Sequence, residues 1–169
     1  MDFNYSEEQE LIANSAKEFA EQLHSLMSLD ESIVLLTGDL GYGLWDRIKI
    51  DYPDRFYNTL SAEQLMMGTA VGMAMEGKIP IVYSITPFAI YRPFELIRNY
   101  LSHEQIPVKI VGGGRDKQYG YLGFSHWAEE DIDVLSVLDI QLFKPESINN
   151  GIINQFIYNK KPSYLNLSK

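Results

Sequence analysis

Cysteine is absent from the 169-residue chain. The protein therefore cannot form a disulfide, use a thiolate nucleophile or bind a metal through cysteine. Long apolar runs are also missing, because no stretch approaches the roughly 20 residues needed to cross a bilayer. The first eight residues have neither the basic start nor the apolar core of a signal peptide. We therefore expect a cytoplasmic protein that does not enter a membrane.

Positive charge is scarce as well. The 14 Lys and Arg residues stand against 23 Asp and Glu residues, which leaves a net charge of −9. Nonspecific binding to nucleic acid depends on Lys and Arg that displace counterions from phosphates, so we expect no nucleic-acid partner. His24, His103 and His126 lie far apart, with no H-x-H or H-x-x-x-H pair. A zinc site within this chain is therefore not expected.

Hydrophobic residues, by contrast, make up 46% of the chain. A long amphipathic helix is predicted by apolar residues at helical spacing, namely Ile12, Ala16, Phe19, Leu23 and Leu26. Further helices are expected at 62–76, 93–101, 129–138 and from near residue 146, and strands at 33–37, 56–58, 80–85, 107–111, 140–143 and 164–167. This alternation predicts an α/β fold: a three-layer, doubly wound, mostly parallel sheet in a single domain over residues 1–169.

Two glycine-rich segments invite a nucleotide-binding interpretation that their spacing does not support. Gly38, Gly41 and Gly43 follow a predicted strand, but they do not form G-x-G-x-x-G and no P-loop lysine follows. We therefore interpret them as a turn between a strand and a helix. The run 112–114 also lacks phosphate-loop spacing, and no G-x-S-x-G nucleophile motif is present.

Three segments together carry a more specific pattern. Residues 56–83 contain a short strand, then Glu63 at the start of a helix rich in glycine and alanine, then a glycine-containing turn and another strand. Residues 88–98 form an aromatic helix start, and residues 120–131 contain a G-x-S-H loop before an acidic segment. This arrangement resembles the pyrimidine-binding domain, or C-terminal section, of the transketolase family of thiamine-diphosphate enzymes. The likeness covers roughly residues 6–169.

The resemblance implies roles for five residues. Glu63 matches the acid that hydrogen-bonds the aminopyrimidine of thiamine diphosphate, a task that requires a carboxyl group in a dry pocket able to share a proton. Phe88 and Tyr91 match aromatic positions that stack on and flank that ring. His126 matches a loop histidine that reaches the reacting carbons as an acid–base group or oxyanion donor. Asp39 matches an acidic position in the loop after the first strand.

The sequence departs from familiar transketolases at two places. Their T-H-D-S segment, which supplies a second histidine, is replaced by residues 112–115, within a segment we expect to be a loop from 112 to 125. Their acid four residues before the loop histidine, which helps to recognise a sugar hydroxyl, is Leu122 here. Either the ligand is less hydroxylated, or Tyr119, Tyr121 or a partner chain recognises the sugar instead.

The family's diphosphate and magnesium motif is also missing. That motif is G-D-G followed at a set distance by asparagine, whereas Gly38-Asp39 is followed by Leu40 and the pair 149–150 lies too far away. We expect no metal ligands in this chain, so Mg²⁺ and the diphosphate would be held by a separate diphosphate-binding subunit. We also expect no third, C-terminal transketolase domain. The simplest assembly is a heterotetramer with two copies of each chain.

The resemblance therefore implies a subunit of an enzyme that transfers a two-carbon ketol unit, with a sugar phosphate or related molecule as substrate. Two alternatives remain open. One is a decarboxylating relative, such as the beta-type subunit of a 2-oxoacid dehydrogenase or a deoxyxylulose-phosphate synthase. The other is a catalytically silent subunit that keeps the fold.

Overall fold

A computed structural model describes residues 7–145 and 147–167. Within them lies a six-stranded sheet in the order β2-β1-β3-β4-β6-β5, and every adjacent pair is parallel. The strands are β1 (Ile33–Thr37), β2 (Phe56–Asn58), β3 (Ile79–Ile85), β4 (Lys109–Gly113), β5 (Gln141–Phe143) and β6 (Ser163–Leu167). Strands β1, β4 and β6 are buried along their whole length, as in a sheet covered on both faces.

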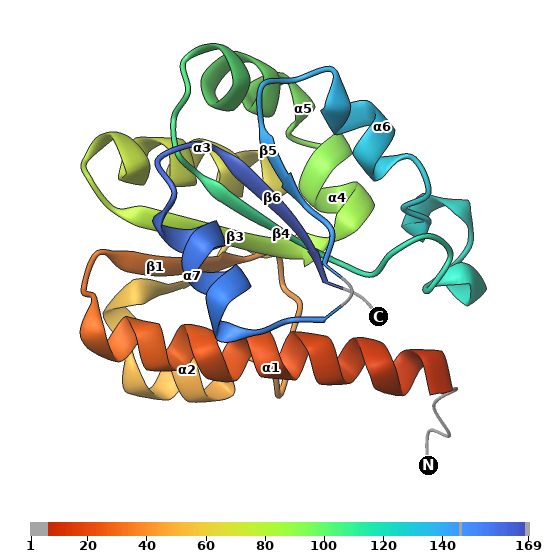
Figure 1. Ribbon diagram of the computed structural model, residues 1–169, viewed down its shortest axis with the longest axis horizontal. Coiled ribbons are helices and arrows are strands. Elements are labelled where there is room, and N and C mark those ends of the chain that lie inside the picture. The colour runs from red at the N-terminus through yellow and green to blue at the C-terminus, as the bar shows by residue number, and fades with distance from the viewer. Residues whose placement is uncertain (1–6, 146, 168–169) are drawn as a thin grey trace.

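Helices cover both faces of this sheet (Figure 1). One face carries α1 (Glu7–Leu29), α2 (Asp46–Asp51) and α7 (Asn150–Tyr158). The other carries α3 (Glu63–Met75), α4 (Thr86–Tyr91), α5 (Phe94–Leu96), a π-helical segment Ile97–His103 and α6 (Asp131–Ser136). The prediction of a three-layer, doubly wound, parallel α/β fold is therefore confirmed.

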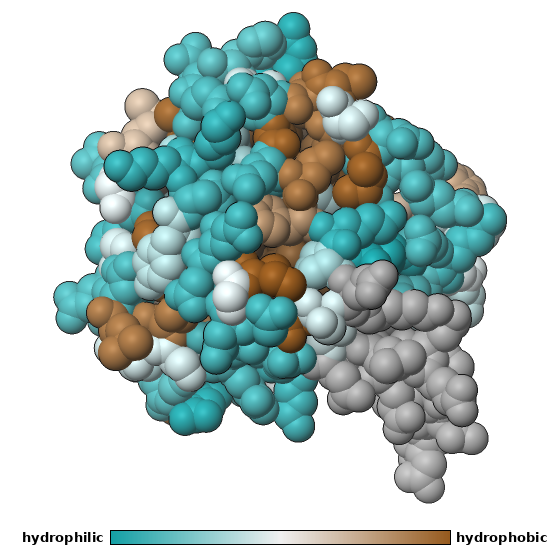
Figure 2. All heavy atoms as spheres, in the orientation of Figure 1, coloured by the Kyte–Doolittle hydropathy of each residue, from teal (hydrophilic) through white to brown (hydrophobic). Residues whose placement is uncertain are grey.

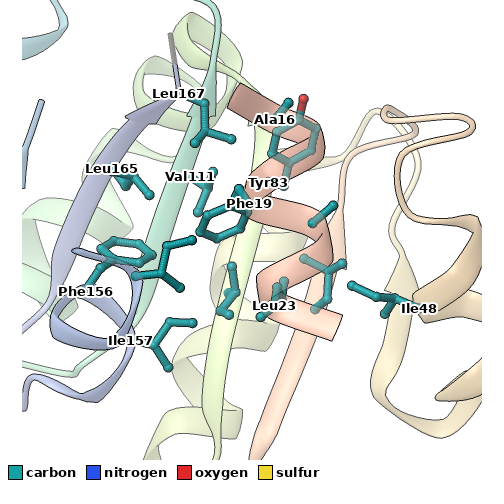
Figure 3. Packing of buried hydrophobic residues seen from close by; sticks show 14 of the residues in the cluster. Ala16, Phe19, Leu23, Ile48, Tyr83, Val111, Phe156, Ile157, Leu165 and Leu167 are labelled. Carbon is teal, nitrogen blue, oxygen red and sulfur yellow. The ribbon is translucent and has the colours of Figure 1, made fainter. Parts of the chain in front are cut away.

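The face under α1 shows why the amphipathic pattern produces this layer. Phe19 and Leu23 of α1 are fully buried and point to the sheet, where they meet Val111 and the α7 residue Phe156 (Figure 3). The Phe19 and Phe156 rings lie edge to face, with centroids 6.4 Å apart. Burial of one such aromatic side chain contributes about 1.5–3 kcal/mol, so the helical spacing in the sequence directly fixes which side of α1 faces inward.

The outer surface agrees with this layering. Figure 2 shows that hydrophilic side chains cover most of the visible face, with apolar side chains gathered over the region of α5, α6 and β5. No helix in the described ranges combines the length and apolar character that a membrane span requires.

Several element boundaries differ from the sequence-based prediction. Helical structure begins before the expected helix 93–101, at Thr86, and is interrupted at Pro93, which has no amide proton to continue the helix. It resumes after Pro93 as α5 and the π-helical segment. The strand predicted at 107–111 runs from Lys109 to Gly113, so two glycines of the expected loop lie in the sheet.

Two further differences concern short helices. The six-residue helix α2 follows the glycine turn, where a helix was expected without bounds, since so short a segment shows no full apolar period. The helix expected from near Glu146 begins at Asn150, where the Asn149 side chain caps it by accepting a hydrogen bond from the Ile152 amide at 3.0 Å. Glu146 itself lies outside the described residues.

One charged side chain is buried at the amino end of β4. Lys109 is 1% exposed, and its Nζ donates hydrogen bonds to the carbonyl oxygens of Asn159 at 2.7 Å and Lys161 at 2.6 Å. A third contact reaches the Asn159 side-chain oxygen at 3.2 Å. All these acceptors come from the segment between α7 and β6, so this cation ties the end of the chain to the centre of the sheet.

Candidate functional site

Glu63 lies at the carboxyl edge of the sheet, where open parallel α/β folds place their ligands. It is the first residue of α3 and is only 2% exposed. The Ser84 hydroxyl at the end of β3 donates to Glu63 Oε1 at 3.2 Å. A Cβ atom at Gly38 would lie 3.2 Å from the same oxygen. Glycine at the end of β1 therefore lets the backbone approach the carboxylate closely.

The second oxygen of Glu63 is bound by Arg92, which follows α4. Arg92 Nη1 donates to Glu63 Oε2 at 2.6 Å. The guanidinium carbon also lies 3.8 Å from the centre of the Phe88 ring, in cation–π contact. Sequence reasoning missed Arg92. The sequence did contain one indication of this contact. Phe88 and Arg92 are four residues apart, so their side chains lie on the same face if the segment is helical.

His126 completes the cluster. Its ring and that of Phe88 lie edge to face with centroids 4.9 Å apart, and its Nδ1 lies 3.0 Å from Ser125 Oγ. The structure thus brings together three residues singled out in the sequence, Glu63, Phe88 and His126, and adds Arg92 between the first two. We call these four residues the Glu63 cluster.

The other two predicted residues make different contacts. Tyr91 is 40% exposed, and its hydroxyl donates to Glu130 at 3.5 Å. Partial burial, with the negative charges of Glu130 and Asp131, raises the pKa of Tyr91 to about 12. Asp39 adopts a left-handed conformation after β1, with φ of 57°. Its carboxylate accepts hydrogen bonds from Tyr42 at 2.6 Å and Asn58 at 3.1 Å, which lower its pKa.

A buried polar network supports the loop that carries His126. The Tyr164 hydroxyl and the Asn166 side-chain amide each donate to Asp131 Oδ2 at 2.7 Å. The other oxygen of Asp131 accepts from the Ile132 amide at 2.7 Å. Burial, with the Asp131 charge, raises the pKa of Tyr164. Because α6 begins at Asp131, the network fixes the end of the His126 loop to β6.

The glycine run at the end of β4 is closely surrounded. A Cβ atom at Gly112 would lie 2.5 Å from Thr86 Oγ1, and one at Gly113 would lie 2.9 Å from the Tyr83 hydroxyl. Gly114 has φ of +84°, and a Cβ there would lie 2.4 Å from the Tyr119 ring. Tyrosine and threonine side chains thus fill the space that larger residues in this segment would need.

A cavity of about 590 Å³ lies beside the same loop, on the α1 face of the sheet. Its lining includes the tyrosines 42, 83, 119 and 121, together with Lys17, His24 and Arg47. Burial raises the pKa of Tyr119 further above its ordinary value. Leu122 is 45% exposed and does not line this cavity. Tyr119 and Tyr121 do line it, and whether they, a partner chain or a less hydroxylated ligand explains Leu122 stays a prediction.

The Glu63 cluster has the chemistry that an aminopyrimidine requires. A buried carboxylate lies beside an aromatic face, and a flat cationic group already fits between the two. No group of three or more His, Asp or Glu side chains with metal-binding geometry occurs among the side chains that the structure describes.

Comparisons with known proteins agree on the family. Residues 13–169 match the transketolase pyrimidine-binding domain model. A putative transketolase C-terminal section of Methanocaldococcus jannaschii is 36% identical over 123 residues, which cover 72% of this chain and 39% of that protein. One of the subunits of an apulose-4-phosphate transketolase from Actinobacillus succinogenes is 33% identical over 120 residues, covering 69% of this chain and 39% of the relative. The chain therefore spans about two fifths of the length of these relatives.

Solved structures show the same fold. A split-gene transketolase, described as an inactive beta4 tetramer, superposes with a TM-score of 0.77 at 30% identity, and the match covers 90% of this chain and 50% of the other. Transketolase from Campylobacter jejuni superposes with a TM-score of 0.78 at 16% identity, with 91% of this chain and 25% of the other covered, which supports the fold alone. The parallel sheet, the helix-borne Glu63 and the family match agree: this chain belongs to the transketolase pyrimidine-binding domain family.

Proposed function

We propose that this chain contributes the pyrimidine-binding domain of a split, thiamine-diphosphate-dependent enzyme that transfers a two-carbon ketol unit. The observation that carries the proposal is the buried carboxylate of Glu63 beside the face of Phe88. A separate diphosphate-binding subunit would supply the diphosphate contacts and Mg²⁺, in a heterotetramer whose active site forms between the two kinds of chain. A division of this kind is supported by relatives that are named as single subunits of a transketolase.

Thiamine diphosphate, when bound, supplies the carbanion chemistry that breaks and forms the carbon–carbon bond. In this proposal Glu63 holds a proton against the pyrimidine ring nitrogen. Its position at the start of α3, fixed by Ser84 and by the close approach of Gly38, orients the carboxyl group before the ligand arrives. Phe88 offers its ring face for stacking, and Tyr91 lies at the outer end of the same short helix.

His126 serves as the group that faces the substrate. Histidine as a residue type has a pKa close to neutrality, so it can donate or accept a proton at the reacting carbons. The edge-to-face contact with Phe88 and the Asp131 network hold its loop in place. Asp39 would contribute to cofactor binding from the neighbouring loop, where its carboxylate accepts hydrogen bonds from Tyr42 and Asn58.

A sugar phosphate or related substrate that meets His126 would extend toward the cavity beside the loop, whose lining contains no residue of the Glu63 cluster. Its volume of about 590 Å³ lies within the usual range of small-molecule sites. Tyrosine hydroxyls on its wall can donate to sugar hydroxyls, and Lys17 and Arg47 provide positive charge for an acidic group.

A decarboxylating reaction is the second candidate. A 1-deoxy-D-xylulose-5-phosphate synthase from Dehalococcoides mccartyi is 28% identical over 136 residues, which cover 79% of this chain and 21% of that enzyme. The replacement of the second histidine segment by residues 112–115 also fits a reaction other than ordinary ketol transfer. Ketol transfer remains preferred, because more of the similar proteins carry the transketolase name.

The test is turnover by the complex reconstituted with a diphosphate-binding subunit. Glu63→Gln keeps the shape of the side chain but removes the acid, so we expect activity to fall by about 100-fold or more. Glu76→Gln, the same change at the exposed end of α3, is the matched control and should leave activity unchanged. Near-normal turnover by Glu63→Gln would show that this carboxylate is not the catalytic acid.

A further inference from the structure

The Glu63 carboxylate already has a flat partner within its own chain. Arg92 donates to Oε2 at 2.6 Å while Ser84 donates to Oε1 at 3.2 Å, so both oxygens are engaged. The same guanidinium lies over Phe88, 3.8 Å from the ring centre. Arginine suits this position because its guanidinium is planar, donates hydrogen bonds in its own plane and stacks on aromatic faces.

We infer that Arg92 occupies the pyrimidine position in the free chain and must move out before a cofactor ring can bind. This inference rests on the proposed function, in which a flat heterocycle contacts the Glu63 carboxylate and stacks on Phe88. Arg92 makes these same two contacts. The guanidinium and the ring would need the same space between the carboxylate and the aromatic face, so they exclude each other.

Burial shows which member of the ion pair moves. The Glu63 side chain is 1% exposed and the Arg92 side chain is 45% exposed. Arg92 can therefore rotate into water and regain its hydration, whereas Glu63 stays in the protein interior. A buried carboxylate left without a partner is unfavourable, so the open state is sparsely populated until another donor contacts Glu63.

The displacement also changes what Glu63 can do. While Arg92 contacts one carboxylate oxygen of Glu63 and Ser84 the other, neither oxygen is available to a ring nitrogen. Departure of Arg92 frees Oε2 for the contact that the proposed chemistry needs. Arg92 thus keeps the free chain inactive and makes ring binding and activation of Glu63 a single event.

The test is thiamine binding by the chain alone, measured by calorimetry at neutral pH. Thiamine carries the pyrimidine ring without the diphosphate, so its binding does not require the diphosphate contacts of a partner. Because a sparsely populated open state weakens the apparent affinity, Arg92→Met should bind thiamine about tenfold or more tightly than the wild type. Arg98→Met, a change at an exposed arginine on the neighbouring helical segment, should bind like the wild type.

Equal or weaker thiamine binding by Arg92→Met, or binding by no variant, would overturn the inference. If Arg92→Met does not fold, the Arg92 Nε–H resonance of the wild type gives a second measurement. We expect this resonance to carry a Phe88 ring-current shift that disappears when thiamine saturates the chain. A resonance unchanged at saturation would also overturn the inference.

These outcomes are separable from failure of the proposed function. If Arg92 is a cofactor contact and not an occupant, Arg92→Met binds thiamine more weakly while Glu63→Gln still abolishes turnover of the complex. If the proposed function is wrong, Glu63→Gln remains active whatever Arg92 does.

Discussion

Lys109, at 1% exposure, and Glu63, at 2%, are both buried charged residues. Their hydrogen-bonding partners differ in kind. Lys109, at the amino end of β4, contacts backbone carbonyl groups that cannot move without unfolding the segment before β6. Glu63, at the carboxyl edge, pairs with the half-exposed Arg92 side chain, which can leave. The same degree of burial therefore supports the fold at one edge and leaves a replaceable contact at the other.

This difference indicates how to separate structural from functional charges in a domain of this kind. Burial alone does not distinguish them, because a buried charge must be paired in either case. The mobility of the partner does distinguish them. Backbone partners make a permanent connection, whereas a side chain that can reach water leaves room for a ligand.

Lys109→Met removes the cation and retains most of the side-chain volume. We expect the free energy of unfolding to fall by about 2–4 kcal/mol, because buried carbonyl groups of Asn159 and Lys161 lose their donor. Denaturant unfolding of the chain measures the effect. Lys160→Met, at an exposed neighbouring lysine, is the control and should change stability by less than about 0.5 kcal/mol. A loss no larger than the control's would contradict a structural role for Lys109.

The pH dependence of stability provides a smaller, independent measure. Burial lowers the pKa of Lys109 to about 8, from an ordinary 10.5. Between these values the unfolded chain binds more protons than the folded chain, so the contribution of Lys109 to the unfolding free energy rises with pH and is lost as pH falls through about 8. The stability of the wild type relative to Lys109→Met should therefore increase from about pH 8 to about pH 9.5, below the range of most tyrosine titrations. A constant difference would show that burial does not shift this lysine.

Glu63→Gln should have the smallest effect on the fold. The amide fills the same space, and Arg92 can turn to water, so we expect the free energy of unfolding to change by less than about 1 kcal/mol. Thermal or denaturant unfolding of the purified chain provides the measurement. A loss as large as that of Lys109→Met would place Glu63 among the structural charges, and the contrast between the two edges of the sheet would disappear.

Much of the fold follows from local patterns in the sequence. The apolar spacing of α1, the buried run of β1 and the small-residue helix starting at Glu63 depend on neighbours along the chain, and these predictions are confirmed. The strand near Gly113 was displaced by two residues from its prediction, and the helical structure before Pro93 was outside the predicted helix. Whether the chain continues a strand or helix at these places depends on contacts with other elements. The catalytic and binding roles given to Glu63, His126, Phe88, Tyr91 and Asp39 remain predictions.

The contacts around those residues could not be predicted in the same way. Glu63 and Arg92 are separated by 29 positions, and Phe88 and His126 come from different elements. In the sequence Lys109 is one charge in an otherwise apolar strand, and its partners lie 50 and 52 residues further along the chain. Such pairings depend on how the sheet is ordered, which a single sequence does not specify.

The crowding at Gly112, Gly113 and Gly114 limits how this segment can be altered. Side chains of Thr86, Tyr83 and Tyr119 occupy the space that a Cβ atom would need at these three positions. A single substitution to histidine in this run would therefore clash. The neighbours would have to become smaller first, at the expense of packing. The close packing around the glycine run thus restricts which side chains this segment can accept.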